Sequence, residues 1–243
     1  MRFSVITVTY NDFDNLKISL ESVRKQRFLD YEYIIIDGGS IDGTIEYFEQ
    51  FSKTDNHIKF YSETDKGIYD AMNKGVSKAT GEYIIFLGAG DTFYSDNILS
   101  EVDNILNDKI DVLYGKVVFS SGENKGNTFG GKVNFFGTLL DNYVAHQSVF
   151  AKKELLELFP FNLDYIYLAD QDFMLNIKSH KYKMKYIDNI ISFYDGMGFS
   201  SDSKNRNDIL NERIRLLKNH NNIIYYIRQF GHFIKNREFY NIR

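Results

Sequence analysis

The amino-acid sequence predicts an α/β fold, with a mostly parallel central sheet, helices on both of its faces and a C-terminal helical tail. Strand-like and helix-like segments alternate through about the first ninety residues, the pattern of a parallel sheet. A chain of 243 residues can bury a full core as one domain, and its 43% hydrophobic and 26% charged residues are ordinary for a globular protein. We expect a single domain over residues 1–212, followed by a tail over residues 213–243.

The first half contains four strand-like segments separated by helix-like segments. The strands are rich in apolar and β-branched side chains, which suits strands buried on both faces of a sheet. Between them, apolar residues recur at helical spacing, and Asp42 is placed to cap the second helix. The expected strands cover residues 3–9, 31–36, 58–61 and 83–87, and the expected helices cover residues 16–23, 45–51 and 67–79.

The second half continues without an internal repeat or a low-complexity linker, so the sequence gives no reason to divide the chain into two domains. A strand is expected over residues 112–119 and a Gly/Asn/Ser loop over residues 120–132. Residues 149–158 are expected to pass from strand to helix, residues 170–179 to form a helix and residues 184–194 to form strands.

The tail has a different composition. From Arg213 onward there are seven Lys or Arg residues and one acid, Glu238, and apolar residues between Ile223 and Ile234 fall roughly on one helical stripe. A basic amphipathic helix of this kind can lie in a membrane interface, but it can also pack on its own domain with a solvated charged face. The sequence leaves both alternatives open.

Composition and charge exclude some classes of protein. The net charge of −4 argues against a general nucleic-acid binder, and the absence of cysteine excludes disulfides, thiolate zinc sites and a cysteine nucleophile. The first residues enter a strand without a secretory leader, and no apolar run approaches the ~18 residues of a membrane span. We expect a cytoplasmic protein, and attachment to the inner face of the plasma membrane is one of the two alternatives for the tail.

Polar side chains follow the first two expected strands. Thr9, Tyr10 and Asn11 end the first strand and can line a nucleoside pocket, whereas the GxGxxG pattern of dinucleotide-binding folds is missing there. Asp37 ends the second strand before two glycines that would let a ligand approach the backbone. Its carboxylate can accept from a base or ribose, or from the backbone of its own turn.

Asp91 follows the apolar fourth strand, and Gly88 and Gly90 leave room beside it. Magnesium and manganese prefer carboxylate oxygens and accept phosphate oxygens as further ligands. Asp91 is therefore a candidate ligand for Mn²⁺ or Mg²⁺. The alternative is an N-cap for a helix that begins at residues 92–95.

Two acids and a histidine in the second half are candidates for proton transfer. Asp170 and Asp172 lie two positions apart at a helix start, so they point in different directions, and one can act as a general base while the other caps the helix. His146 precedes a strand and is either a ligand-binding residue or a structural one. Residues 196–200, which include Gly198 and Ser200, can form a lid or a turn.

In their order, these segments resemble the sequence blocks of the inverting family 2 glycosyltransferases with the GT-A fold. The match is strong over residues 3–95, weaker beyond and absent in the tail, and it is most similar to bacterial exopolysaccharide, capsule or O-antigen enzymes of the colanic-acid type. The blocks are residues 5–11, Asp37-Gly-Gly-Ser-Ile-Asp-Gly-Thr44, Asp65-Lys-Gly67, Ala71-x-Asn73-x-Gly75, Thr80-Gly81-Glu82, the strand to Asp91, His146-Gln-Ser148, Ala169-Asp-Gln-Asp172 and Gly196-x-Gly198-x-Ser200.

The resemblance implies that about residues 1–95 bind a nucleotide-diphosphate sugar and about residues 96–212 bind the acceptor. Asp170 matches the family's general base, with Asp172 as the fallback, and Asp91 matches the ligand of the divalent metal. The chain departs from the family at Gly88 and Gly90, where members commonly carry acids. The implied donor-binding residues are Thr9, Asn11, Asp37, Asp65, Lys66 and Asn73, and the implied acceptor-side residues are His146, Gly198 and Ser200.

The implied reaction is a metal-assisted, inverting transfer of a sugar, from a UDP-sugar in the first instance, to a glycan hydroxyl in bacterial surface polysaccharide synthesis. A polyprenyl-diphosphate-linked acceptor would suit the tail. One alternative is a non-catalytic homologue that binds nucleotide sugar or scaffolds an assembly, and Gly88 and Gly90 favour it. Another is a sugar-nucleotide pyrophosphorylase, but the acidic segment after the first strand lacks the basic loop that holds a triphosphate.

Overall fold

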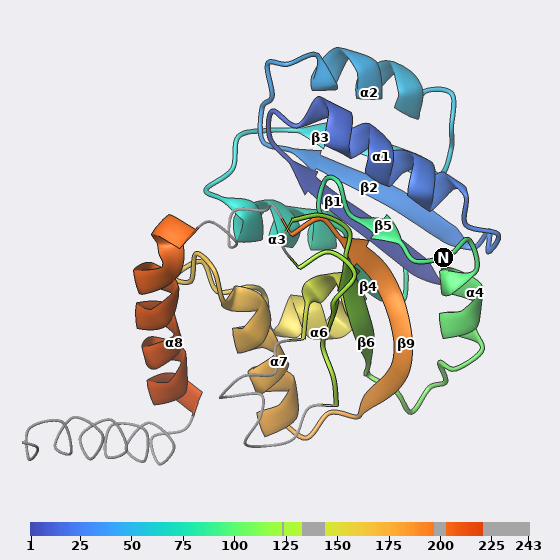
Figure 1. Cartoon of the computed structure of the whole chain (residues 1–243). Helices are drawn as coiled ribbons and strands as arrows, with labels where there is room; N and C mark the ends of the chain where they lie inside the picture. The colour runs from blue at the N-terminus through green and yellow to red at the C-terminus, as the bar shows by residue number, and fades with distance from the viewer. Residues whose placement is uncertain (123, 133–143, 197–202, 221–243) are drawn as a thin grey trace, which may run out of the picture.

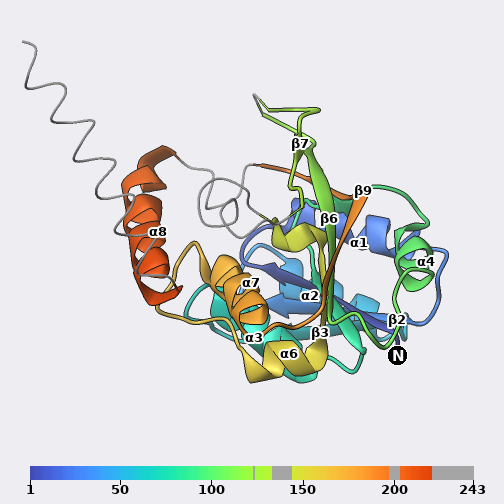
Figure 2. The ribbon, with the colours of Figure 1, turned by 90° about the horizontal axis from the view of Figure 1, so that it is seen from below.

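A computed structural model describes residues 1–122, 124–132, 144–196 and 203–220. Its centre is one mixed sheet with helices packed on both faces, as Figures 1 and 2 show from two directions. The order of the strands across the sheet is β3-β2-β1-β4-β8-β6-β9-β5, and β7 pairs with β6. The α/β class predicted from the sequence is confirmed.

The first four strands form the parallel half of the sheet, as predicted. They are β1 (Phe3–Thr9), β2 (Tyr31–Asp37), β3 (Ile58–Ser62) and β4 (Tyr83–Phe86). β1 pairs in parallel with both β2 and β4, and β2 pairs in parallel with β3. Every residue of β1, β2 and β4 is buried, because helices cover both faces, and this explains their nearly continuous apolar sequences.

The second half of the sheet is mixed rather than parallel. β8 (Val149–Lys152) runs antiparallel to both β4 and β6 (Val112–Phe119), while β9 (Met184–Tyr194) runs parallel to β6. β7 (Thr128–Phe129) pairs with β6 inside the segment that was expected to be a loop. β5 (Thr92–Phe93) pairs with β9, so no helix begins at residues 92–95 and the capping alternative for Asp91 was wrong.

Helices cover both faces of the sheet. One face carries α1 (Phe13–Arg24), α2 (Thr44–Ser52) and α4 (Ile98–Asp103), which share a hydrophobic cluster with Leu16, Phe48 and Leu99 among its members. The other face carries α3 (Ile68–Lys78), α6 (Lys153–Leu158) and α7 (Ala169–Ser179), with Met72 and Phe173 in a second cluster. The carboxyl end of the parallel half lies between these two layers.

The helix α8 (Arg206–His220) packs beside α7, as both ribbon views show. Leu216 and Leu217 are buried in the same cluster as Phe173, and Glu212 is 7% exposed. The expected domain boundary at residue 213 therefore falls inside a helix that belongs to the domain. The remainder of the predicted tail, residues 221–243, lies outside the described residues.

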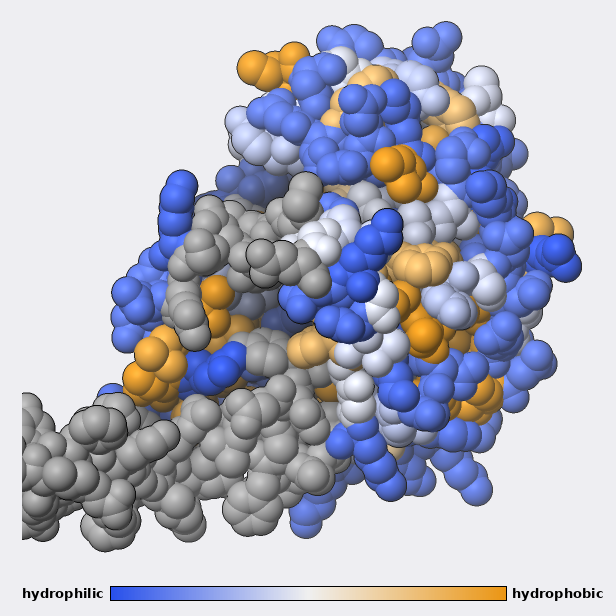
Figure 3. Space-filling model, viewed as in Figure 1, coloured by the Kyte–Doolittle hydropathy of each residue, from blue (hydrophilic) through white to orange (hydrophobic). Residues whose placement is uncertain are grey.

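The described part of the chain contains no helix that is long and apolar enough to cross a membrane. On the face drawn in Figure 3, the described surface is mostly hydrophilic, and apolar side chains come to the surface in small groups. Scattered apolar side chains of this kind are normal on a globular protein.

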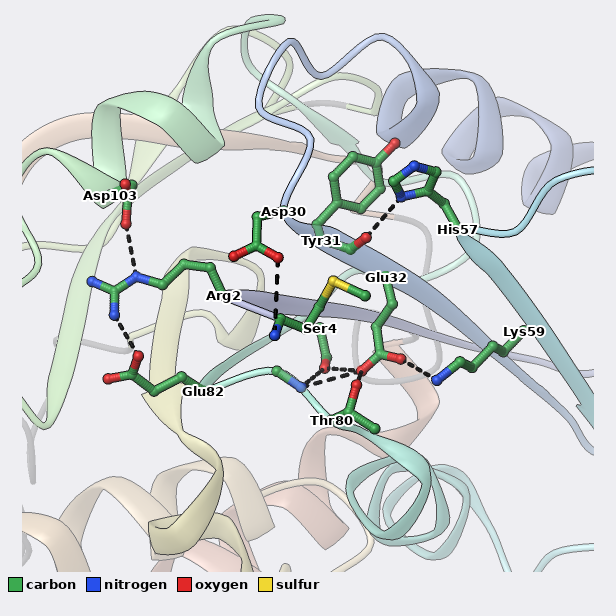
Figure 4. Close-up of polar contacts among 12 residues, drawn as sticks. Arg2, Ser4, Asp30, Tyr31, Glu32, His57, Lys59, Thr80, Glu82 and Asp103 are labelled. Carbon is green, nitrogen blue, oxygen red and sulfur yellow. Dashed lines mark hydrogen bonds and ion pairs between the residues drawn. The ribbon is translucent and has the colours of Figure 1, made fainter.

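A buried carboxylate ties the strands together at the amino end of the sheet (Figure 4). Glu32 on β2 accepts hydrogen bonds from Ser4 Oγ on β1 and from the backbone and hydroxyl of Thr80 just before β4, and it pairs with Lys59 on β3. Burial by itself would raise the pKa of Glu32, but these partners outweigh it and lower the pKa to about 2. A charged network thus fixes the amino end of the parallel strands. The predicted site residues Thr9 and Asp37 lie at the opposite, carboxyl end.

Candidate active site

The predicted donor residues lie at the carboxyl ends of neighbouring parallel strands. Thr9 ends β1 and is paired in register with Asp37, which ends β2. The peptide N–H of Gly38 donates to the carbonyl of Thr9, so the turn after β2 lies against the end of β1. This edge of an open α/β sheet is the usual place for a ligand.

The side chains of Asp37 and Asn11 shape the turn between them. Asp37 is fully buried and accepts from the backbone N–H of Gly39 and Ser40 and from the hydroxyls of Ser40 and Ser62. Asn11 has a positive φ of 51° and accepts from the N–H of Ile41. Both residues therefore organise the rim of the site, and their predicted contacts with the donor remain predictions.

Tyr10 and Asp65 lie beside Gly38, in the turn that follows β2. A Cβ at Gly38 would lie 2.7 Å from Asp65 Oδ2 and 3.2 Å from the ring of Tyr10, so any larger residue would require these side chains to shift. Tyr10 is 64% exposed, and its ring can stack on a planar heterocycle. Thr9 Oγ1 is buried without a hydrogen-bond partner among the described residues, and its predicted contact with the donor remains a prediction.

The other two predicted donor residues differ in environment. Lys66 is exposed at the approach to α3, where its backbone N–H donates to Asp70. Asn73 instead faces Phe161, since its amide nitrogen donates to the carbonyl of Phe161 and its oxygen accepts from the N–H of the same residue. This pair of hydrogen bonds gives Asn73 a structural task, and a contact with the donor remains a prediction.

Asp91 lies buried at the centre of the site, with 3% of its surface exposed. Its Oδ2 accepts from Gly88 N–H at 2.9 Å and from Gln147 Nε2 at 3.0 Å, and its Oδ1 accepts from Asp195 N–H at 2.9 Å. Burial raises the pKa of Asp91, and these donors partly offset that effect. The three hydrogen bonds fix the carboxylate in one orientation.

The two glycines before Asp91 are required by this turn. A Cβ at Gly88 would come within 2.8 Å of Asp91 Oδ2, and Gly90 has a φ of +90°, a conformation that other residues rarely adopt. The side chain of Asp195, at the end of β9, lies close to Gly90. An acid at position 88 would therefore require the Asp91 side chain to shift, and an acid at position 90 would strain the backbone.

Asp170 lies at the start of α7 with two hydrogen-bonding side chains around it. Its Oδ2 is 3.2 Å from His146 Nδ1, and its Oδ1 is 3.2 Å from the hydroxyl of Tyr69 on α3. The side chains of Asp170 and His146 are 17% and 20% exposed. Asp170 is therefore partly accessible and oriented, as a general base needs to be.

A single turn of 3-10 helix, η1 (His146–Ser148), connects the two acids. His146 contacts Asp170, while the next residue, Gln147, contacts Asp91, so adjacent side chains reach the predicted metal ligand and the predicted base. Behind Asp170 and His146 lies a small apolar cavity. Its other lining residues include Phe86, Val149, Phe161, Phe173 and Met174.

Asp172 points away from this site, as the spacing of the two acids predicted. Its Oδ1 is 2.6 Å from His220 Nε2 of α8, and Asn176 donates to its Oδ2. Asp172 therefore joins α7 to α8, whereas Asp170 faces the site. The predicted acceptor residues Gly198 and Ser200 lie outside the described residues.

Sequence reasoning did not assign a role to Gln147, Tyr69, Asp195 or Glu212. Gln147 is the one whose position the sequence could have indicated, because it lies within the block His146-Gln-Ser148. Its partner could not have been indicated, since the contact between Gln147 and Asp91 joins segments far apart in the chain. No local pattern reveals such pairs.

The sequence profile of Glycosyl transferase family 2 matches residues 4–158. The chain belongs to this family. A PGL/p-HBAD biosynthesis glycosyltransferase of Mycobacterium tuberculosis is 32% identical over 206 residues, covering 83% of this chain and 79% of the relative. An uncharacterized glycosyltransferase of Haemophilus influenzae is 28% identical, covering 69% of this chain and 70% of the relative.

Solved structures show the same fold for this family 2 glycosyltransferase. S. aureus TarS 1-349 in complex with UDP-GlcNAc has a TM-score of 0.70 at 20% identity, covering 91% of this chain and 68% of that one. The mannosyltransferase PcManGT from Pyrobaculum calidifontis, in complex with GDP-Man and Mn²⁺, has a TM-score of 0.67 at 18% identity, covering 88% and 63%. This chain spans 39% of a longer TarS chain.

Asp91 is the carboxylate that the sequence predicted as the metal ligand of this glycosyltransferase. Among the described residues, no three His, Cys, Asp or Glu side chains are close enough together to hold an ion. Both oxygens of Asp91 already accept hydrogen bonds. The described residues do not form a metal site by themselves, so an ion at Asp91 would need further ligands from a bound donor.

Proposed function

We propose that this family 2 glycosyltransferase inverts the anomeric centre as it transfers a sugar from a nucleotide diphosphate to a hydroxyl of a glycan acceptor. The observation that carries the proposal is η1, whose adjacent residues His146 and Gln147 contact Asp170 and Asp91. These two contacts connect the partly exposed carboxylate of Asp170 with the buried carboxylate of Asp91. A base for the acceptor and an anchor for the donor are the two groups that an inverting transfer requires.

In the proposed reaction, Asp170 is the general base. The acceptor hydroxyl oxygen attacks the anomeric carbon, its proton passes to the Asp170 carboxylate, and the bond between the anomeric carbon and the phosphate oxygen breaks. The bonding electrons leave with the nucleotide diphosphate. His146, with Nδ1 protonated, would donate to Oδ2 of Asp170 and so hold the other oxygen in place.

The donor would lie across the carboxyl ends of β1 and β2. We assign the base to Tyr10 and Asp65, because both lie beside Gly38 and the ring of Tyr10 is exposed. Lys66, exposed before α3, would approach the phosphates. We propose UDP as the nucleotide, although structural neighbours are described with either UDP-GlcNAc or GDP-Man.

We also propose that Asp91 is the protein ligand of a Mn²⁺ or Mg²⁺ ion whose other ligands come from the donor diphosphate. Such an ion would stabilise the charge that develops on the leaving phosphate. Release of nucleotide from a panel of UDP-, GDP- and dTDP-sugars should then require Mn²⁺ and stop with EDTA. Equal release from the preferred donor in EDTA would contradict this assignment.

The biological role proposed is the assembly of a bacterial surface polysaccharide at the inner face of the plasma membrane. The acceptor would be a glycan carried on polyprenyl diphosphate. This proposal rests on the basic, amphipathic composition of residues 213–243, most of which lie outside the described part of the chain.

The test of the general base is the variant Asp170→Asn, with Asp172→Asn as the matched control on the same helix. Asp170→Asn should lower turnover by ~10²–10⁴-fold and leave donor binding intact, because only the proton acceptor is lost. Asp172→Asn should retain more activity, since Asp172 contacts α8 rather than the site.

Near-normal turnover of Asp170→Asn together with loss of turnover in Asp172→Asn would move the role of general base to Asp172. A chain that binds donor but never transfers would instead be the non-catalytic homologue.

A further inference from the structure

Tyr69 is buried next to the proposed base and is not used by the proposed mechanism. Its side chain packs against Phe161, with ring centroids 5.4 Å apart, and only 6% of the residue is exposed. Its hydroxyl lies 2.9 Å from the carbonyl oxygen of Tyr167 and 3.2 Å from Asp170 Oδ1. A phenol has one proton to donate, so two acceptors compete for it.

Tyr69 remains a neutral donor throughout the working range of pH. Burial raises the pKa of its hydroxyl well above the ordinary value, and the negative charge of Asp170 raises it further. The hydroxyl must therefore always direct its proton to one of the two acceptors. When Asp170 is ionised, the carboxylate is the stronger acceptor, because hydrogen bonds to a charged group are stronger than those to a neutral carbonyl.

The second acceptor is fixed by α8. Glu212, which is 7% exposed, accepts from two consecutive backbone N–H groups, that of Ile166 at 2.6 Å and that of Tyr167 at 2.9 Å. The same Tyr167 presents its carbonyl to Tyr69. A chain of contacts thus runs from α8 through the loop before α7 to Oδ1 of the proposed base.

We propose that Tyr69 is a positioning residue for Asp170, whose hydroxyl proton is shared between Asp170 and the Tyr167 carbonyl that Glu212 holds in place. The hydroxyl donates to Asp170 while that carboxylate is ionised. When Asp170 takes the proton of the acceptor, the Tyr69 hydroxyl turns to the carbonyl of Tyr167. No heavy atom has to move, and no buried group loses its partner. This inference rests on Asp170 being the general base.

The groups that face Asp170 can affect the pH dependence of turnover. His146 of η1 lies against Oδ2, Tyr69 of α3 lies against Oδ1, and Glu212 of α8 acts on Tyr69. On its own helix, the nearby acid Asp172 is paired with His220. His146 is present in every variant below, so its titration is common to all of them.

The first test is the pH dependence of turnover for Tyr69→Phe, which keeps the ring and removes the hydroxyl. Loss of a donor to the ionised base should move the acidic limb of the profile to higher pH, and loss of its orientation should lower kcat on the pH-independent plateau several-fold. The KM for the donor should not change. Tyr165→Phe is the matched control, since the Tyr165 hydroxyl is also buried but accepts from Asn219 of α8. A Tyr69→Phe profile that superimposes on that of the wild type would overturn the proposal.

The double variant Tyr69→Phe/Asp170→Asn separates this inference from the proposed function. If Tyr69 acts through Asp170, its substitution should have no further effect on kcat in the Asp170→Asn background. An equal loss in both backgrounds would overturn the inference and leave Asp170 as the base. Near-normal activity of Asp170→Asn alone would overturn the proposed function instead.

Glu212 variants give a second measurement that does not depend on the folding of Tyr69→Phe. Glu212→Ala should lower kcat several-fold with an unchanged KM for the donor, because the carbonyl of Tyr167 is released. Glu212→Gln should recover most of that loss, since its amide oxygen can still accept one N–H. Equal kcat values for Glu212→Ala and the wild type would overturn the part assigned to α8.

Discussion

At the scale of single residues, Gly88 shows how a small residue shapes the site. Its backbone N–H donates to Asp91, and the space that a Cβ would need is filled by the carboxylate oxygen that accepts this hydrogen bond. Asp91 is additionally held by Gln147 and Asp195. The orientation of one acid therefore depends on the absence of a side chain three residues earlier.

It follows that restoring an acid at position 88 should damage the site. Gly88→Asp should lower transferase turnover about tenfold or more, because the new side chain displaces the oxygen of Asp91 that faces Gln147. The matched control is Gly131→Asp, where a Cβ would meet no atom of the described residues within 4 Å. A Gly88→Asp protein that turns over faster with Mn²⁺ than the wild type would show that the glycine is a lost ligand position rather than a packing requirement.

At the scale of secondary-structure elements, α8 stabilises the loop that leads into α7. Its Leu216 and Leu217 are buried, its Glu212 binds the backbone of that loop, and its last residue, His220, pairs with Asp172. α8 is thus part of the domain and supports the helix that carries Asp170. Loosening α8 should affect both stability and turnover.

The variant Leu217→Ala tests this role of α8. It should lower the free energy of unfolding by about 2–5 kcal/mol, the usual cost of removing a buried leucine side chain. Leu210→Ala on the same helix is the control, because Leu210 is 52% exposed and should cost less than about 0.5 kcal/mol. Chemical denaturation of both proteins would measure the difference. Equal losses in the free energy of unfolding would mean that the packing of α8 does not stabilise the fold.

At the scale of the whole molecule, a buried carboxyl group at each end of the sheet has its pKa shifted, and the two shifts have opposite directions. At the amino end, Glu32 is ionised and fully paired, with a pKa of about 2. At the carboxyl end, burial raises the pKa of Asp91. The ionised form of Glu32 stabilises the fold, whereas ionisation of Asp91 opposes its burial. The charge of Glu32 thus stabilises the amino end of the sheet, whereas the charge of Asp91 does not stabilise the carboxyl end.

The pH dependence of unfolding should show the contribution of Glu32. A carboxyl whose pKa falls from 4.5 to about 2 on folding contributes up to about 3 kcal/mol above pH 4.5, and this contribution is lost as the pH falls through about 2. Glu32→Gln should therefore be less stable than the wild type at pH 7, and the difference should shrink below pH 4.5. The exposed Glu49 provides the control variant Glu49→Gln. A difference that does not change with pH would show that Glu32 acts only through packing.

Much of the fold was predictable because it depends on local periodicity. The parallel half follows from continuous apolar strands such as Phe3–Thr9, and α3 and α7 follow from helical spacing. β5 and β7 were not predictable, since each has two residues and exists only through pairing with β9 or β6. The expected boundary at residue 213 falls inside α8, because the composition of the tail changes before that helix ends.

The sequence by itself determined the family and the parallel half of the sheet. It also determined that Asp91 follows the fourth strand and that Asp170 lies at the start of a helix. These depend on the order of side chains along short segments. Only the tertiary structure decided that Gln147 orients Asp91, that Tyr69 and His146 flank Asp170, and that Asp172 faces α8. Each of these contacts joins segments distant in the chain, and their geometry is set by the packing of helices on a sheet, which no single stretch of sequence contains.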